Sequence, residues 1–284
     1  MASKTTEHNR QGFVTLFNSI ARHKHRYAVF SDFVIMCAIA LHNAIYMNQE
    51  LENEYLEIVG RYSKEEVNTF CELYAILVNL LEPEPNDILG SLYMELELTN
   101  SNNGQFFTPH EVSRLLAKIT YGEVLDNLKK PFITLSEPAC GAGGMVLAFV
   151  SEMLKKGINP AEKLFVNCID IDRVAGLMCY VQLSLWHIPA EIIIGDTLSL
   201  KFREIYYTPS YHLGRWDIKL RMRNFLNSLS NLSEPIEQHE VVAINEIQVK
   251  KDFSLVKELE PTKTKKEHLK NGTQVDLFDF MIDH

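Results

Sequence analysis

The spacing of apolar residues divides the chain into two stretches with different patterns. Between about residues 10 and 100, apolar side chains recur three and four positions apart, and no strong run alternates with period two. The first such group is Phe13, Leu16, Phe17 and Ile20. This spacing puts the apolar residues on one face of each helix, so it predicts a helical region. The polar run Thr99-Asn-Ser-Asn-Asn-Gly predicts the loop that closes it.

Beyond this loop, short apolar runs alternate with helical patterns. Strands are expected at 132–135, 164–169 and 191–194, and helices at 145–154 and 173–186. Such alternation is typical of an α/β fold with a parallel sheet and right-handed crossovers. A further strand is expected at 240–245, and from about Val249 the Lys- and Glu-rich composition predicts a flexible tail. The pattern therefore predicts an α-helical N-terminal domain (1–100), an α/β domain (101–248), and a linker with an interaction tail (249–284).

Charge is unevenly distributed along the 284 residues, of which 46% are apolar. The net charge of −9 argues against binding nucleic acid by bulk attraction, but residues 47–100 alone carry twelve acids and two basic residues. The rest of the chain is close to neutral and includes basic clusters. Candidate contacts to DNA phosphates are Arg22, Lys24, Arg26, Arg215, Lys219, Arg221 and Arg223. The alternative is that these residues only keep helix faces solvated.

The cysteines and the apolar runs indicate the cellular setting. Five cysteines, an odd number without a C-x-x-C pair, predict free thiols and neither disulfides nor a metal site. The longest apolar run, residues 33–41, is too short to span a membrane, and the polar N-terminus does not resemble a signal peptide. We therefore expect a soluble, cytoplasmic protein.

The segment Ser136-Glu-Pro-Ala-Cys-Gly-Ala-Gly-Gly-Met lies where a predicted strand ends and a helix begins. Gly141 and Gly143 would let backbone amides approach a ligand at the helix N-terminus. By itself the segment fits a tight strand-to-helix turn equally well.

Three further motifs accompany this glycine loop. They are Gly104-Gln-Phe-Phe-Thr-Pro-His-Glu, Cys168-Ile-Asp-Ile-Asp and Ile194-Gly-Asp-Thr-Leu. In order and spacing, the four motifs resemble those of N6-adenine DNA methyltransferases of the type I restriction-modification class, over about residues 85–200. The resemblance implies a Rossmann-like sheet that binds S-adenosylmethionine.

The resemblance also implies which residues hold this cofactor. Phe107, Thr108 and Pro109 match the segment at its methionine end, and Glu137, Cys140, Gly141 and Gly143 match the cofactor loop. Asp170 matches the acid that accepts hydrogen bonds from the ribose, and Asp196 the acid that accepts from the adenine amino group. From its position we expect Asp172 to be a helix N-cap, not a ligand.

The chain departs from the family at the catalytic step. These enzymes grip a flipped adenine with Asn-Pro-Pro-Tyr or Asn-Pro-Pro-Phe, and no such tetrapeptide occurs here. In one register, a strand at 216–221 precedes Met222-Arg-Asn-Phe; in the other, a strand at 240–244 precedes Asn245. Completing the sheet would take on the order of 70 to 100 further residues, and 59 follow Phe225. We therefore expect an incomplete sheet.

These observations predict a SAM-binding, DNA-associated pseudoenzyme of this family, with a regulatory or anti-restriction role. The first alternative is an active adenine-N6 DNA methyltransferase that uses Asn245, alone or with a restriction-modification partner subunit. The second is an interaction module without cofactor.

A last motif, Gln274-Val-Asp-Leu-Phe, is similar to the pentapeptide by which bacterial proteins bind the replication sliding clamp. Leu277 and Phe278 would be the apolar anchors and Gln274 the polar contact of an extended peptide in a groove. Alternatively, this tail packs on its own domain.

Overall fold

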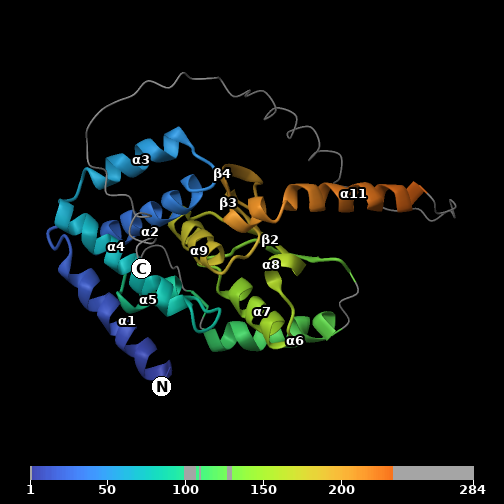
Figure 1. Ribbon diagram of the computed structural model, residues 1–284, viewed down its shortest axis with the longest axis horizontal. Helices are drawn as coiled ribbons and strands as arrows, with labels where there is room; N and C mark the ends of the chain where they lie inside the picture. The colour runs from blue at the N-terminus through green and yellow to red at the C-terminus, as the bar shows by residue number, and fades with distance from the viewer. Residues whose placement is uncertain (1, 99–106, 109, 127–129, 233–284) are drawn as a thin grey trace. The chain divides into compact units, whose positions relative to one another are not determined.

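The computed structural model describes residues 2–98, 107–108, 110–126 and 130–232 (Figure 1). The chain divides into two compact units, Met1–Leu220 and Arg221–His284. Six helices precede the sheet: α1 (Ala2–Ser19), α2 (Arg26–Asn43), α3 (Gln49–Val59), α4 (Lys64–Leu81), α5 (Ile88–Glu95) and α6 (His110–Asp126). The strands are β1 (Ile133–Glu137), β2 (Leu164–Asp170), β3 (Ala190–Asp196) and β4 (Lys201–Tyr207). The remaining helices are α7 (Gly144–Lys155), α8 (Pro160–Lys163), α9 (Arg173–Leu185), α10 (Pro209–Leu213) and α11 (Trp216–Leu232).

The N-terminal region is helical, as the apolar spacing predicts, and residues 2–98 contain no strand. Local capping fixes where helices begin: Ser63 and Glu66 form a reciprocal capping box at the start of α4. The helices enclose an aromatic core in which the Phe33 ring packs edge-on against Phe13 and stacks on Phe70. Burial of this apolar surface stabilises the helical region.

Helix α2 joins the helical region to the sheet. Its side chains are buried over most of its length, and it packs against both α3 and α9. The buried carboxylate of Asp32 on this helix accepts a 2.7 Å hydrogen bond from the Tyr62 hydroxyl. A helix that is apolar on nearly all sides must be covered on all sides, so α2 holds the two regions in one compact unit.

The sheet has the order β1-β2-β3-β4. The first three strands are parallel, as expected for an α/β fold, with Leu135 opposite Val166 and Cys168 opposite Ile192. The sequence pattern misses β4, which pairs antiparallel with β3. Its first four residues include three charged ones, which hide the strand signal. The four-residue connection before it is too short for a parallel crossover, so the chain turns back as a hairpin.

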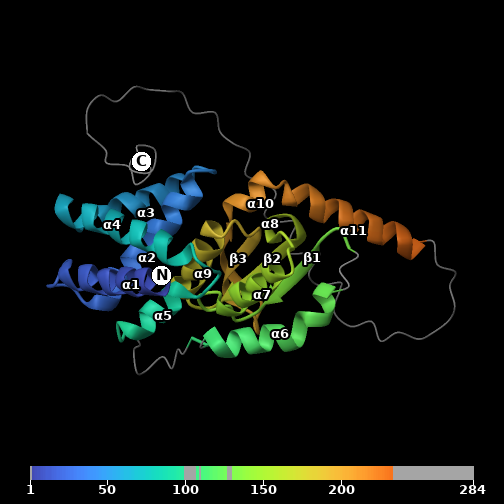
Figure 2. The ribbon, with the colours of Figure 1, turned by 60° about the horizontal axis from the view of Figure 1, so that its bottom comes forward.

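Helices α7 and α9 lie on the same face of the sheet (Figure 2). This follows from right-handed crossovers between strands that are added in one direction. Alternate side chains of β2 point to the opposite face, where the ring of Phe165 stacks on Trp216 at the start of α11. Among the described residues, β1 pairs with β2 alone, so it is an edge strand.

Of the two registers considered for the catalytic segment, the one with a strand at 216–221 is wrong, because this segment begins α11. The run Trp-Asp-Ile-Lys-Leu-Arg alternates with period two, but Ile218, Met222 and Phe225 continue at helical spacing. Lys, Leu, Arg and Met also have high helix propensity. The expected strand at 240–245 lies outside the described residues. In the part of the chain that is described, no helix is long and apolar enough to cross a membrane.

Candidate cofactor site

The loop between β1 and α7 is tied to the end of β2 by its backbone. The N–H of Cys140 donates to the carbonyl of Ile169 at 2.9 Å, and the N–H of Gly143 donates to the carbonyl of Cys140 at 2.8 Å. Gly143 has a φ of +92°, and a Cβ atom there would lie 2.9 Å from the Cys179 sulfur. Glycine is therefore required both by the backbone conformation and by the close approach to α9.

Asp170, at the carboxyl end of β2, binds this loop through its side chain. Its two carboxylate oxygens accept from the N–H of Gly141 at 2.7 Å and from the N–H of Asp172 at 2.9 Å. Burial raises the pKa of the Asp170 carboxyl above its ordinary value, although the backbone donors offset part of the effect. A carboxylate oxygen has about two lone-pair sites, so each oxygen keeps acceptor capacity for a ligand hydroxyl. The geometry thus fits the predicted ribose-binding role.

Asp172 caps the next helix. Its side chain accepts from the N–H of Ala175 at 2.8 Å, and it is the N-cap of α9. The prediction that Asp172 is a cap is confirmed.

Asp196, at the end of β3, is surrounded by donors from its own loop. Its carboxylate accepts from the N–H of Leu198 at 2.9 Å and from the hydroxyl of Ser199 at 2.7 Å. The Ser199 hydroxyl and the N–H groups of Leu198 and Ser199 lower the pKa of Asp196. The neighbouring Thr197 donates to the Pro138 carbonyl at 2.6 Å, so the loops after β1 and β3 meet at one end of the sheet.

Phe107 lies over the glycine loop. A Cβ atom on Gly141 would be 3.2 Å from its ring, and Tyr93 of α5 packs edge-on against the ring with centroids 5.4 Å apart. The next residue, Thr108, is exposed, and Pro109 lies outside the described residues. The predicted methionine-end segment and the predicted cofactor loop are therefore brought together through Phe107.

Glu137 is the last residue of β1 and is half-buried. Burial raises the pKa of its carboxyl, and among the described residues its carboxylate accepts from the N–H of Ala139 at 3.4 Å. This hydrogen bond is long, which leaves the carboxylate weakly engaged by the chain itself.

A buried glutamine that the motifs do not identify organises the site. The amide of Gln182, on α9, donates to Asp87 at 2.9 Å and to the carbonyl of Ala142 in the glycine loop at 2.8 Å. Its oxygen accepts from the N–H groups of Ile88 and Leu89 at 2.8 and 3.0 Å. All four hydrogen-bonding positions of the amide are thus used. No sequence motif marks Gln182, because its partners lie in segments 40 to 95 residues away.

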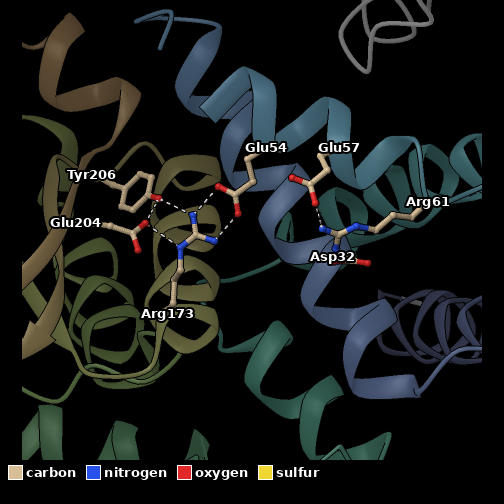
Figure 3. Close-up of polar contacts among 7 residues, drawn as sticks. All are labelled: Asp32, Glu54, Glu57, Arg61, Arg173, Glu204 and Tyr206. Carbon is tan, nitrogen blue, oxygen red and sulfur yellow. Dashed lines mark hydrogen bonds and ion pairs between the residues drawn. The ribbon is translucent and has the colours of Figure 1, made fainter. Parts of the chain in front are cut away.

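A second network, of ion pairs and hydrogen bonds, surrounds Arg173 at the start of α9 (Figure 3). Arg173 donates to both carboxylate oxygens of Glu54 on α3, at 2.7 and 2.9 Å, and to Glu204 on β4 at 2.8 Å. The Tyr206 hydroxyl donates to Glu204 at 2.6 Å. The bidentate contact and the shared carboxylate link α3, α9 and β4 through one guanidinium.

The candidate DNA contacts have different surroundings. Arg26 donates to the carbonyls of Phe17 and Ile20 at 3.1 and 2.8 Å, and so caps the end of α1. Lys24 lies over the Tyr62 ring at 4.8 Å, and Lys219 lies over the Trp216 ring at 4.3 Å. Arg22 and Arg215 are exposed, and Arg221 and Arg223 lie on α11. Asn245, Gln274, Leu277 and Phe278 lie outside the described residues.

Residues 84–212 match a protein-family model described as N-6 DNA Methylase. This segment includes the glycine loop, Asp170 and Asp196, and it makes up less than half of the chain. No curated protein matches the chain significantly.

Solved structures give weaker likenesses. A type I restriction-modification system methyltransferase subunit from Streptococcus thermophilus shares 12% identity at a TM-score of 0.41, covering 70% of this chain and 59% of its own. A protein from Listeria monocytogenes assigned to the class I S-adenosylmethionine-dependent methyltransferases shares 16% identity at a TM-score of 0.40, covering 67% of this chain and 54% of its own. The chain therefore spans little more than half the length of these proteins, and such TM-scores carry no conclusion about it.

Proposed function

We propose that this chain is a DNA-associated member of the N-6 DNA methylase family that binds S-adenosylmethionine at the carboxyl end of its parallel strands. One observation carries the proposal: the carboxylate of Asp170, at the end of β2, holds the N–H of Gly141 in the glycine loop at 2.7 Å. An acid at this position of a doubly wound sheet can accept from ribose hydroxyls while the glycine loop approaches the rest of the ligand. The family match over 84–212 supports this assignment.

The other residues of the site have complementary roles in this proposal. The N-terminus of α7 favours the negatively charged carboxylate of the cofactor. The Phe107 ring, which packs on Gly141, covers the loop and excludes water from one side. When bound, the cofactor would supply an electrophilic methyl group.

We further propose that the chain does not methylate adenine by itself. Transfer requires that the adenine nitrogen be polarised and aligned with the methyl group, which the Asn-Pro-Pro-aromatic tetrapeptide does in this family. The sequence lacks this tetrapeptide. The segment after β3 forms the antiparallel strand β4 and then helices, in place of a parallel strand leading to a base-binding loop.

Calorimetry with S-adenosylmethionine and the purified full chain tests cofactor binding. We expect one site per chain, and an Asp170→Ala variant should weaken binding about a hundredfold, since two charge-assisted hydrogen bonds to the ribose are lost. Asp172→Asn is the matched control, because asparagine caps helices as well as aspartate does. Absence of binding to the wild-type chain would refute the cofactor site.

Catalysis is tested separately with methyl-labelled S-adenosylmethionine and unmethylated DNA. We expect cofactor binding without label on adenine. Label transfer would refute the impairment and favour the alternative in which Asn245 accepts from the adenine amino group. An Asn245→Ala variant would then be inactive.

DNA is proposed as a partner through the basic residues around the start of α11. A double variant, Arg215→Ala with Lys219→Ala, should weaken binding to duplex DNA equally for all sequences and reduce the salt dependence, because phosphate contacts release counterions. Lys64→Ala, in the acidic helical region, is the control. Anisotropy titrations at several salt concentrations measure both effects, and an unchanged salt slope would contradict the proposal.

A bacterial replication sliding clamp remains a proposed partner of residues 274–278. This rests on the peptide Gln274-Val-Asp-Leu-Phe alone. Leu277→Ala with Phe278→Ala should abolish clamp binding if the two side chains are the anchors of a docked peptide. Equal affinity of the variant and the wild type for the purified clamp would end this proposal.

A further inference from the structure

Three cysteine side chains meet beneath the glycine loop. Cys140 comes from the loop itself, Cys168 from β2 and Cys179 from α9, and their sulfur atoms all lie within 4.8 Å of one another. The sulfurs of Cys168 and Cys179 are 3.7 Å apart. The sequence gives no sign of this cluster, because the residues are 28 and 11 positions apart and belong to apolar runs.

The cluster is closed to solvent. Cys168 and Cys179 are 0% exposed, and Cys140 is 6% exposed. A cysteine must lose its thiol proton to ligate a metal ion, so an ion bound here would be held by thiolates that bulk solvent does not reach.

The spacing of the three sulfurs matches the bond length of a thiophilic cation. A Zn–S bond is about 2.3 Å, so a tetrahedral cation bound by three sulfurs would separate them by about 3.8 Å. The observed 3.7 Å pair and the 4.8 Å upper limit lie on either side of this value. The three sulfurs thus lie at about the separation that three ligands of one such cation would have.

We propose that Cys140, Cys168 and Cys179 form a binding site for one divalent thiophilic cation of the Zn²⁺ class. Thiolate ligands select soft and borderline cations over Mg²⁺ and Ca²⁺. Three thiolates and one divalent cation carry a net charge of −1, and the N-terminus of the nearby helix α7 favours a negative charge. A monovalent cation would leave a net charge of −2 in a buried site, which is less favourable. A tetrahedral ion would take its fourth ligand from a small molecule such as water.

Such a site would fix the cofactor loop to the sheet, which goes beyond the proposed function. Cys140 directly precedes Gly141, whose N–H binds Asp170, and Cys179 contacts the position of Gly143. A bound ion would therefore link the loop to β2 and α9 whether or not the chain binds S-adenosylmethionine. The ion would stabilise the folded state by mass action.

The test uses the full chain, reduced and stripped of metal with a chelator under anaerobic conditions. Zn²⁺ is added, the protein is desalted, and bound metal is counted by elemental analysis. We expect one ion per chain and a release of protons on binding, because the thiol ligands must ionise. Binding by surface carboxylates would release none. Cd²⁺ serves as a spectroscopic probe, since sulfur ligation gives an ultraviolet charge-transfer band.

Variants separate the cluster from the other thiols of the chain. Cys140→Ser, Cys168→Ser and Cys179→Ser should each lower the affinity at least tenfold, whereas a double variant at Cys37 and Cys71 should still bind one ion. Circular dichroism checks that each variant folds. A wild-type chain that retains no ion, or binds one without proton release or the Cd²⁺ band, overturns the proposal without reference to any variant.

Discussion

The loop after β1 and the loop after β3 meet at the same end of the sheet, but they are held in place differently. The glycine loop after β1 is fixed by side chains from far along the sequence, Asp170 and Gln182. The loop after β3 is held chiefly by its own acid, Asp196, which binds residues two and three positions ahead, and by one contact with a distant segment, from Thr197 to the Pro138 carbonyl. One side of the site therefore depends mainly on contacts between distant segments, and the other mainly on hydrogen bonds within a local turn.

This difference separates the two sides of the proposed cofactor site. The side that depends on the fold contains Asp170 and the glycine loop, whereas the locally held side contributes Asp196 to the proposed cofactor site. After Asp196, the chain turns back as β4 and continues into α10 and α11. Substitutions on the side held by distant segments should therefore change stability and cofactor affinity more than substitutions on the locally held side.

The largest effect is expected for Gln182→Leu. The change keeps the volume but leaves two N–H groups, the Asp87 carboxylate and the Ala142 carbonyl without their buried partner. Each unsatisfied buried group costs about 1–3 kcal/mol, so we expect a loss of about 4 kcal/mol in the free energy of unfolding. Urea unfolding measures it. The exposed Gln11→Leu is the control, and a cost below 1 kcal/mol for Gln182→Leu would mean that the network contributes little.

The second effect concerns the pH dependence of cofactor affinity. Because burial raises the pKa of Asp170, acidification should protonate its carboxylate at a higher pH than the ordinary aspartate value of about 3.9. The protonated group accepts ribose hydroxyls poorly, so affinity should fall as the pH drops through the raised pKa. The sign for folding is opposite: a raised pKa contributes stability at low pH that is lost as the pH rises through it.

Calorimetric titrations at decreasing pH, with a circular dichroism check that the chain stays folded, measure this dependence. Asp170→Asn should bind more weakly at neutral pH, and the part of the pH dependence that comes from Asp170 should vanish. An equal fall of affinity in both proteins would assign the dependence to another group.

The sequence predicts the parts of the fold that follow from local periodicity. The helical region, the three parallel strands and the cap at Asp172 are confirmed, because spacing and capping chemistry determine them within a few residues. Lys201, Arg203 and Glu204 conceal the pattern of strand β4. The register with a strand at 216–221 rests on its parallel with the catalytic strand of the family, and this segment forms a helix instead.

The candidate site is predictable only where a motif marks a residue. Resemblance to a family singles out Asp170 and Gly141, which the structure brings together at 2.7 Å. Gln182 and the sulfur cluster depend on contacts between distant segments, for which a single sequence has no local signal. The domain boundaries at 100 and 248 stay predictions.

The third expected effect concerns the ion pairs of Arg173 that link β4 to α3 and α9. Arg173→Lys keeps the charge but loses the bidentate contact with Glu54 and the shared contact with Glu204. The groups are partly exposed, so we expect a loss of about 1–2 kcal/mol in the free energy of unfolding. Arg61→Lys, on a more exposed arginine, is the control. Equal effects of the two variants would show that the Arg173 network adds nothing beyond a surface ion pair.

The smallest effect is expected for Asp196→Ala, on the locally held side. Its carboxylate already accepts three hydrogen bonds, from the N–H groups of Leu198 and Ser199 and from the Ser199 hydroxyl, against two at Asp170, so its capacity for a ligand is lower. We expect cofactor affinity to fall less than tenfold, against about a hundredfold for Asp170→Ala. Calorimetry on the two variants measures the ratio of their losses in cofactor affinity, with Asp172→Asn as the common control. If Asp196→Ala weakens binding as much as Asp170→Ala does, the β3 loop must rearrange to bind the cofactor, and the two sides of the site are equally important for binding.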